Sequence, residues 1–71
     1  MKNKLIKYEI VRGEKTETKR GRDAYSQCMT DFYTFYHLLS FEKVENFNSF
    51  VVINHYRDND GNPVDVRAYY A

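Results

Sequence analysis

The feature that most limits the fold of this chain is a stripe of apolar residues along one predicted helix. Six of its twelve aromatic residues lie between Asp23 and Phe41. The spacing predicts a helix from about Ala24 to Leu39 or Phe41, with Asp23 as its N-cap. A chain of 71 residues needs such a face for its core, so we expect the stripe to be buried. At about 100° per residue, its members are Tyr25, Cys28, Met29, Phe32, Tyr33, Phe35, Tyr36 and Leu39.

The segment before this helix alternates between apolar and polar residues, which indicates strands. In residues 4–11, Ile6, Tyr8 and Ile10 share one predicted face. Residues 15–20 alternate Thr with charged residues and contain no large apolar side chain. This second pattern fits a charged edge strand hairpinned to the first, and a disordered basic loop is the alternative.

The C-terminal part of the chain predicts a β-hairpin. Residues 50–56 are β-branched and aromatic and indicate a central strand. Residues 58–63 contain an Asp-Gly step and a proline, which are typical of a turn, and residues 64–70 alternate again. The turn lacks the glycine and glutamate spacing of an EF-hand calcium loop, so we interpret it as a solvated hairpin turn. Residues 42–49 are predicted to form a loop.

Together these elements predict one α+β domain over residues 1–71. A single helix packs on one face of a small antiparallel sheet, in the order β-β-α-β-β, or β-α-β-β if residues 15–20 form a loop. No apolar run has the length of a signal peptide or a membrane span. The lone cysteine cannot form an internal disulfide. We therefore expect a cytoplasmic protein without a membrane segment.

Catalytic and metal-binding motifs are not evident in the sequence. A thiol nucleophile would require Cys28 to meet His37 or His55. Cys28 lies within the apolar stripe, where a free thiol usually packs as a small hydrophobe, and His37 lies on the polar side of the predicted helix. A zinc ion would lack ligands. We expect no enzymatic activity, no metal and no cofactor.

Charge is divided unevenly along the chain, although the net charge is only +1. Residues 1–22 carry +5 and residues 23–71 carry −4. The N-terminus of the predicted helix, where backbone amides favour a phosphate, follows a run of bases. A solvated hairpin with internally compensated charge is the alternative interpretation. The candidates for contact with a nucleic-acid backbone are Lys15, Lys19, Arg20 and Arg22.

Surplus tyrosine indicates a protein-binding surface. One helix covers only one face of a sheet, and the alternation of the last strand places Tyr69 and Tyr70 on opposite faces. Tyr and Arg are over-represented at protein interfaces. Leu38 and Phe41 fall outside the helical stripe, so they are candidates to contact another molecule at the end of the helix. The complete set of predicted contact residues is Tyr69, Arg67, Arg57, His55, Leu38 and Phe41.

These features favour a small non-enzymatic binding protein. The leading expectation is an accessory or inhibitor protein of phage or mobile-element type, since the composition is typical of AT-rich genomes. It would act by occupying the surface of a larger protein, as anti-CRISPR and anti-restriction proteins do, an analogy of size and composition alone. The alternative is a DNA- or RNA-binding regulator. A homodimer, formed through the uncovered sheet face or an edge strand, is compatible with either function.

Overall fold

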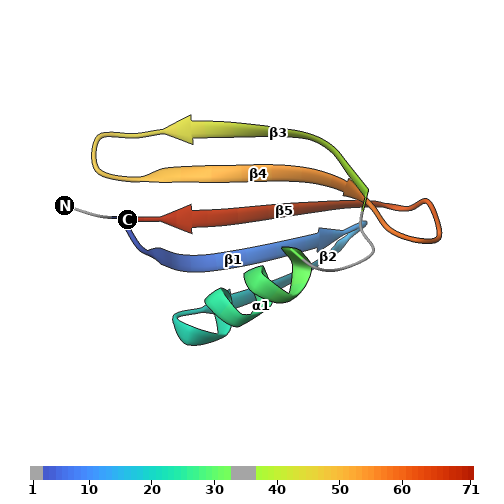
Figure 1. Cartoon of the computed structure of the whole chain (residues 1–71), viewed down its shortest axis with the longest axis horizontal. Helices are drawn as coiled ribbons and strands as arrows, with labels where there is room; N and C mark the ends of the chain where they lie inside the picture. The colour runs from blue at the N-terminus through green and yellow to red at the C-terminus, as the bar shows by residue number, and fades with distance from the viewer. Residues whose placement is uncertain (1–2, 33–36) are drawn as a thin grey trace.

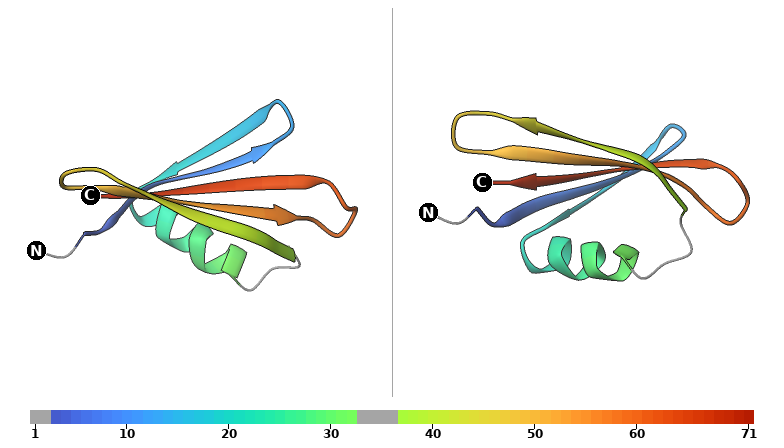
Figure 2. Two further views of the ribbon diagram at one scale, coloured as in Figure 1. Left: turned by 90° about the horizontal axis from the view of Figure 1, so that it is seen from above. Right: turned by 45° about the horizontal axis from the view of Figure 1, so that its top comes forward.

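The computed structural model describes residues 3–32 and 37–71, which form a five-stranded sheet with one helix on one face (Figures 1 and 2). Across the sheet the strand order is β2-β1-β5-β4-β3, and all neighbouring strands are antiparallel. The predicted α+β fold is therefore confirmed, with one strand more than expected. In chain order the elements are β1 (Leu5–Arg12), β2 (Lys15–Arg20), α1 (Arg22–Phe32), β3 (His37–Glu45), β4 (Phe50–Arg57) and β5 (Pro63–Tyr70).

Both predicted hairpins form. Residues 15–20 pair with β1 as a strand, so the alternative of a loop is wrong. In the β4–β5 turn, Asp58 Oδ1 accepts hydrogen bonds from the backbone N–H groups of Asp60 and Asn62, each at 2.9 Å. Gly61 supplies the positive φ, +84°, that this turn requires. The Asp58 carboxylate therefore orders the backbone of the turn, which agrees with the interpretation of this segment as a hairpin turn.

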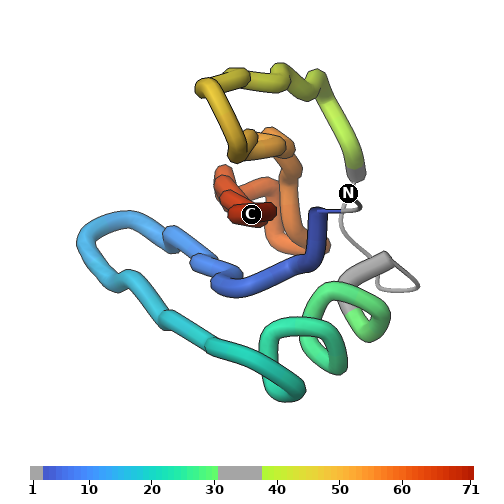
Figure 3. Tube along the Cα trace, turned by 90° about the vertical axis from the view of Figure 1, so that its left-hand side faces the viewer, coloured from blue at the N-terminus to red at the C-terminus, as the bar shows by residue number. Residues whose placement is uncertain are grey.

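The strands β1 and β5 join the two hairpins into one sheet. They are the first and last strands of the chain, and they pair along most of their length. The pairing continues beyond them, because the N–H of Lys4 donates to the carbonyl of Ala71 at 2.9 Å and the N–H of Ala71 donates back at 3.0 Å. In the view along the sheet, β1 (blue) lies next to β5 (red) (Figure 3).

The core lies between α1 and the β1–β5 part of the sheet. Because residues directly opposite in a sheet share a face, the pairs Tyr8–Ala68 and Ile10–Val66 point to the same side. Ile6 was expected to join them, but a bulge between Leu5 and Lys7 turns it outward and leaves it 48% exposed. The buried apolar residues are Tyr8, Ile10, Ala24, Val64, Val66 and Ala68.

The helix differs from the prediction at both ends. The carbonyl of Gly21 accepts the first helical bond, from the N–H of Tyr25 at 3.3 Å, so Gly21 rather than Asp23 is the N-cap. The chain is already in β3 at His37, so the predicted helix end at Leu39 or Phe41 is wrong, and residues 42–45 of the loop predicted over residues 42–49 belong to the strand. Pairing with β4 along β3, interrupted only by the bulge between Leu38 and Ser40, outweighs the helical spacing. No helix of the described residues has the length and apolar character needed to cross a bilayer.

The apolar stripe is only partly buried. Ala24 is fully buried and Cys28 packs against the core, but Tyr25 is 61% exposed and Met29 is exposed too. The reason is that α1 packs mainly on β1 and β2, which leaves the sides of the helix uncovered. Leu39 lies in β3 and is exposed, so the expectation that the whole stripe forms the core is wrong. Three of its members, Tyr33, Phe35 and Tyr36, lie outside the described residues.

Candidate protein-binding face

The candidate site is the face of the sheet that points away from α1, here called the open face. The side of the sheet opposite α1 carries no other element of the described chain (Figure 2). All buried residues of the described chain lie on the other face or in α1. The strand registers place on the open face Lys7, Glu9, Arg20, Glu42, Val44, Val51, Ile53, His55, Arg57, Asp65, Arg67 and Tyr69.

Four of the six predicted contact residues meet on this face. His55 and Arg57 come from β4, and Arg67 and Tyr69 come from β5. Arg57 Nη1 also donates to the carbonyl of Gly61 at 3.2 Å, which fixes the side chain over the turn.

The other two predicted contact residues are elsewhere. Leu38 is opposite Tyr56 and Phe41 is opposite Asn54, so both lie on the same side of the sheet as α1. They are exposed, as expected of contact residues, but they belong to the edge strand β3 and not to the end of a helix. The six residues therefore form two separate surfaces.

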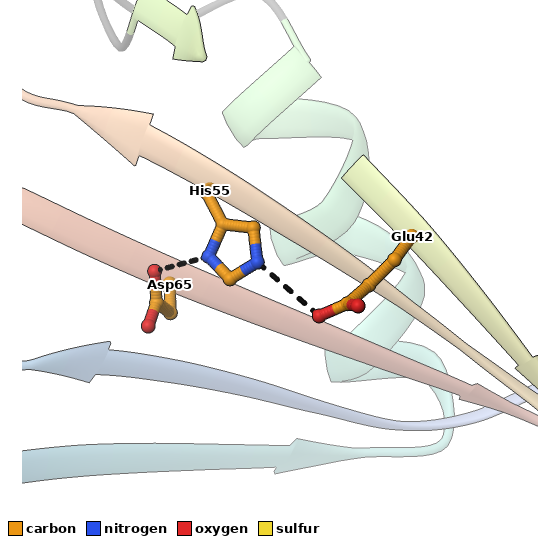
Figure 4. Close-up of polar contacts among 3 residues, drawn as sticks. All are labelled: Glu42, His55 and Asp65. Atoms are coloured by element: carbon orange, nitrogen blue, oxygen red, sulfur yellow. Dashed lines mark hydrogen bonds and ion pairs between the residues drawn. The ribbon is translucent and has the colours of Figure 1, made fainter. Parts of the chain in front are cut away.

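A histidine between two carboxylates connects three strands of the open face (Figure 4). His55 Nδ1 lies 2.8 Å from Asp65 Oδ1, and His55 Nε2 lies 3.4 Å from Glu42 Oε1. An imidazole can satisfy two carboxylates only when both ring nitrogens carry a proton. The hydrogen bond to Asp65, followed by the one to Glu42, raises the pKa of His55 above its usual 6.5, although desolvation opposes the shift.

This cluster predicts that stability falls as the pH rises. Because the pKa of His55 is raised in the folded state, its stabilising effect is complete below pH 6.5 and is lost as the pH passes through the folded-state pKa. We expect the melting temperature to drop between pH 5.5 and 8.5 by more in the wild type than in His55→Gln, measured by circular dichroism. Equal drops in both proteins would contradict the prediction.

A second cluster, here called the Tyr69 cluster, consists of Lys7, Glu9, Arg67 and Tyr69. The Tyr69 hydroxyl donates to Glu9 Oε1 at 2.5 Å, and Arg67 Nη1 lies 3.9 Å from the same oxygen. The Lys7 ammonium lies 4.3 Å from the centre of the Tyr69 ring, within cation–π range. The hydrogen bond to Glu9 raises the pKa of Tyr69, and desolvation adds to this rise. The phenol is therefore held as a neutral donor in a fixed orientation.

The bases proposed for nucleic-acid contact are divided between two faces. In β2, the side chains of Lys15 and Lys19 point to one side of the sheet and that of Arg20 points to the other, because side chains alternate along a strand. Arg22 is the first residue of α1. Arg20 is directly opposite Lys7 on the open face. The structure therefore does not gather the four predicted bases on one face.

The structure does not bring Cys28 and His55 together. Cys28 packs against the core on one side of the sheet, and His55 lies on the other. Among residues 3–32 and 37–71, no group of three or more His, Cys, Asp or Glu side chains has the geometry to hold a metal ion.

Some open-face residues were missed by sequence reasoning. The alternation of polar and apolar residues in β1 and β5 is sufficient to place Lys7, Glu9 and Asp65 on the face of Arg67 and Tyr69. These three residues could therefore have been predicted from the sequence. Glu42 could not, because it fell in a predicted loop. No protein-family model matches the chain, and no curated protein or solved structure matches it either.

Proposed function

We propose that this chain is a small, non-enzymatic, cytoplasmic binding protein that covers part of the surface of a larger protein with its open face. The observation that carries the proposal is the convergence of His55, Arg57, Arg67 and Tyr69 on one uncovered sheet face. By its size and composition, we infer an accessory or inhibitor protein of phage or mobile-element type, in the manner of anti-CRISPR or anti-restriction proteins.

The Tyr69 cluster supports this proposal because its side chains are already ordered. Binding usually costs about 0.5–1.5 kcal/mol for each flexible side chain that becomes immobilised. Tyr69 is held by Glu9, and Arg67 lies against the same carboxylate. Tyr69 can therefore contact a partner with little further loss of conformational entropy.

The size and composition of the open face also fit a protein interface. The molecule measures 40 × 23 × 23 Å, so its broad face can supply the roughly 800 Å² per partner that a standard interface buries. Val44, Val51 and Ile53 provide apolar surface, and charged groups of both signs surround them. Such a mixture of apolar, aromatic and charged groups is typical of interfaces between separately folded proteins.

Affinity purification with matched arginine variants tests the proposal. Arg67 lies 3.9 Å from Glu9 on the open face, and Arg12 lies 4.0 Å from Glu17 at the far end of β1. We expect the tagged wild type to retain a stoichiometric protein from host lysate. Arg67→Ala should weaken that complex by roughly 30-fold or more, as for an interface hot spot, and Arg12→Ala should not. The proposal fails if no stoichiometric protein is retained, or if both variants weaken the complex equally.

Nucleic-acid binding is the second candidate function, favoured by the pairing of Lys7 with Arg20 beside Tyr69 on the open face. Two adjacent bases can contact phosphates while an aromatic ring stacks on a base. Gel retardation of mixed DNA and RNA at about 50 mM salt would support this function, since phosphate contacts are strongest at low salt. Absence of retardation there removes it.

A further inference from the structure

The two edges of the sheet differ in their protection against pairing with another strand. An edge strand presents unpaired backbone N–H and C=O groups, and charged side chains commonly block their use. In β2, one edge, four of the six residues are charged. The other edge is β3, nine residues long, and no described strand pairs with its outer side. Its exposed side chains include the apolar residues Leu38, Leu39, Phe41 and Val44.

Exposed apolar groups flank β3 on both faces of the sheet. Phe41 is 68% exposed on the same face as α1, and Val44 is 48% exposed on the open face. Phe47, in the turn between β3 and β4, is 97% exposed. Figure 1 shows α1 over β1 and β2, at the opposite side of the sheet from β3. A strand added along β3 would contact apolar groups on both faces at once.

We propose that this strand is β3 of a second copy of the chain. The two β3 strands pair antiparallel around a two-fold axis perpendicular to the sheet, which joins two sheets into one continuous sheet. Such a symmetric interface is closed, so it stops at two copies. The pairing satisfies the outward backbone groups of both edges where the two strands overlap, and the outer edges of the dimer are the charged β2 strands.

The sequence of β3 is complementary to itself in one register of this pairing. With Val44 on the axis, Lys43 of each copy lies opposite Glu45 of the other copy. Within one chain Lys43 Nζ is already 3.1 Å from Glu45 Oε1, so the two side chains share a face. Four charges of alternating sign therefore surround the axis. The same register places Phe41 of each copy level with the β3–β4 turn of the other copy, where Phe47 is 97% exposed.

Other symmetric registers are less favourable. An axis at Glu42 or at Lys43 places two like charges directly opposite each other, which destabilises a strand pair. An axis at Phe41 brings the bulge between Leu38 and Ser40 into the new pairing. An axis at Val44 uses only the regular part of β3 that follows the bulge. In this dimer the open faces of the two copies lie on the same side of the joined sheet, and the pairing uses the strand edges instead of these faces. Dimerisation therefore does not depend on the proposed function.

Charge exchange between Lys43 and Glu45 tests the dimer. Lys43→Glu alone opposes two pairs of carboxylates across the axis, and Glu45→Lys alone opposes two pairs of ammonium groups. We expect each variant to raise the dissociation constant of the dimer at least about tenfold. An equimolar mixture should regain wild-type affinity, because every carboxylate then meets an ammonium group. Light scattering after size exclusion should show wild-type particles approaching twice the 8.5 kDa of one chain.

The controls separate dimerisation from folding. Lys15→Glu changes the charge by the same amount on the opposite edge, β2, and should leave the dissociation constant unchanged. Thermal unfolding by circular dichroism verifies that each variant is folded. The proposal is overturned if the wild type is monomeric at about 300 μM, where even weak specific dimers assemble. It is overturned as well if the folded variants, once mixed, give particles no heavier than either alone.

Discussion

Ile10→Ala is expected to lower the free energy of unfolding by about 2–5 kcal/mol, the usual cost of truncating a buried isoleucine. Ile10 is 2% exposed and belongs to the cluster that joins β1 to β5. In a domain of this size each kcal/mol lowers the melting temperature by roughly 4–8 °C. We therefore expect a fall of at least about 10 °C in a thermal melt followed by circular dichroism.

Ile6→Ala is the matched control, because it makes the same change four residues earlier in the same strand. The bulge leaves Ile6 48% exposed, so we expect a loss below about 0.5 kcal/mol, as for ordinary surface substitutions. A regular β1, without the bulge, would place Ile6 on the same face as Ile10. Equal destabilisation by the two variants would show that the bulge does not form.

Ala24→Asp is expected to remove a large part of the stability of the domain. Ala24 has no exposed surface and packs in the cluster that contains Val64 and Val66. A carboxylate placed there has no partner, and an uncompensated buried charge costs about 3–5 kcal/mol. Small domains of this length have a total stability of roughly 4–10 kcal/mol. We expect α1 to detach from the sheet, with loss of the near-ultraviolet signal of Tyr8 and its neighbours.

Ser26→Asp introduces the same charge two residues away, at an exposed position. The comparison separates the effect of burial on stability from the effect of charge. Ser26 is exposed near the N-terminus of α1, where a negative charge is favourable. We expect its melting temperature to stay within about 3 °C of the wild type, since exposed substitutions of this kind change stability little. If Ala24→Asp unfolds like Ser26→Asp, then α1 does not pack on the sheet as described.

Local signals in the sequence were sufficient for the two hairpins. The Asp58 carboxylate and the positive φ of Gly61 fix the β4–β5 turn through contacts between neighbouring residues, and the alternation on either side fixes which residues share a face. For the same reason Arg67 and Tyr69 could be placed together. Their meeting with His55 and Arg57 depends on the register between β4 and β5, which follows from the length of that turn.

The signals failed where a distant segment decides the local conformation. The predicted helix ended at Leu39 or Phe41 and the predicted loop began at residue 42, but His37–Glu45 pairs with β4 and forms one strand. The one local sign of the strand was that Leu38 and Phe41 fall outside the apolar stripe of the predicted helix. Ile6 failed for a similar reason, because the bulge that turns it outward is set by the register against β5. Such register choices depend on residues far along the chain.

The pairing of β1 with β5 has a consequence for synthesis on the ribosome. About 50 residues separate the end of β1 from the start of β5, which at roughly 5–20 residues per second takes several seconds to translate. A β-hairpin forms within about 10 μs. The β1–β2 hairpin therefore waits, with the inner edge of β1 unpaired, until β5 emerges. During that interval the unpaired edge of β1 presents free backbone N–H and C=O groups, with which another extended chain can pair.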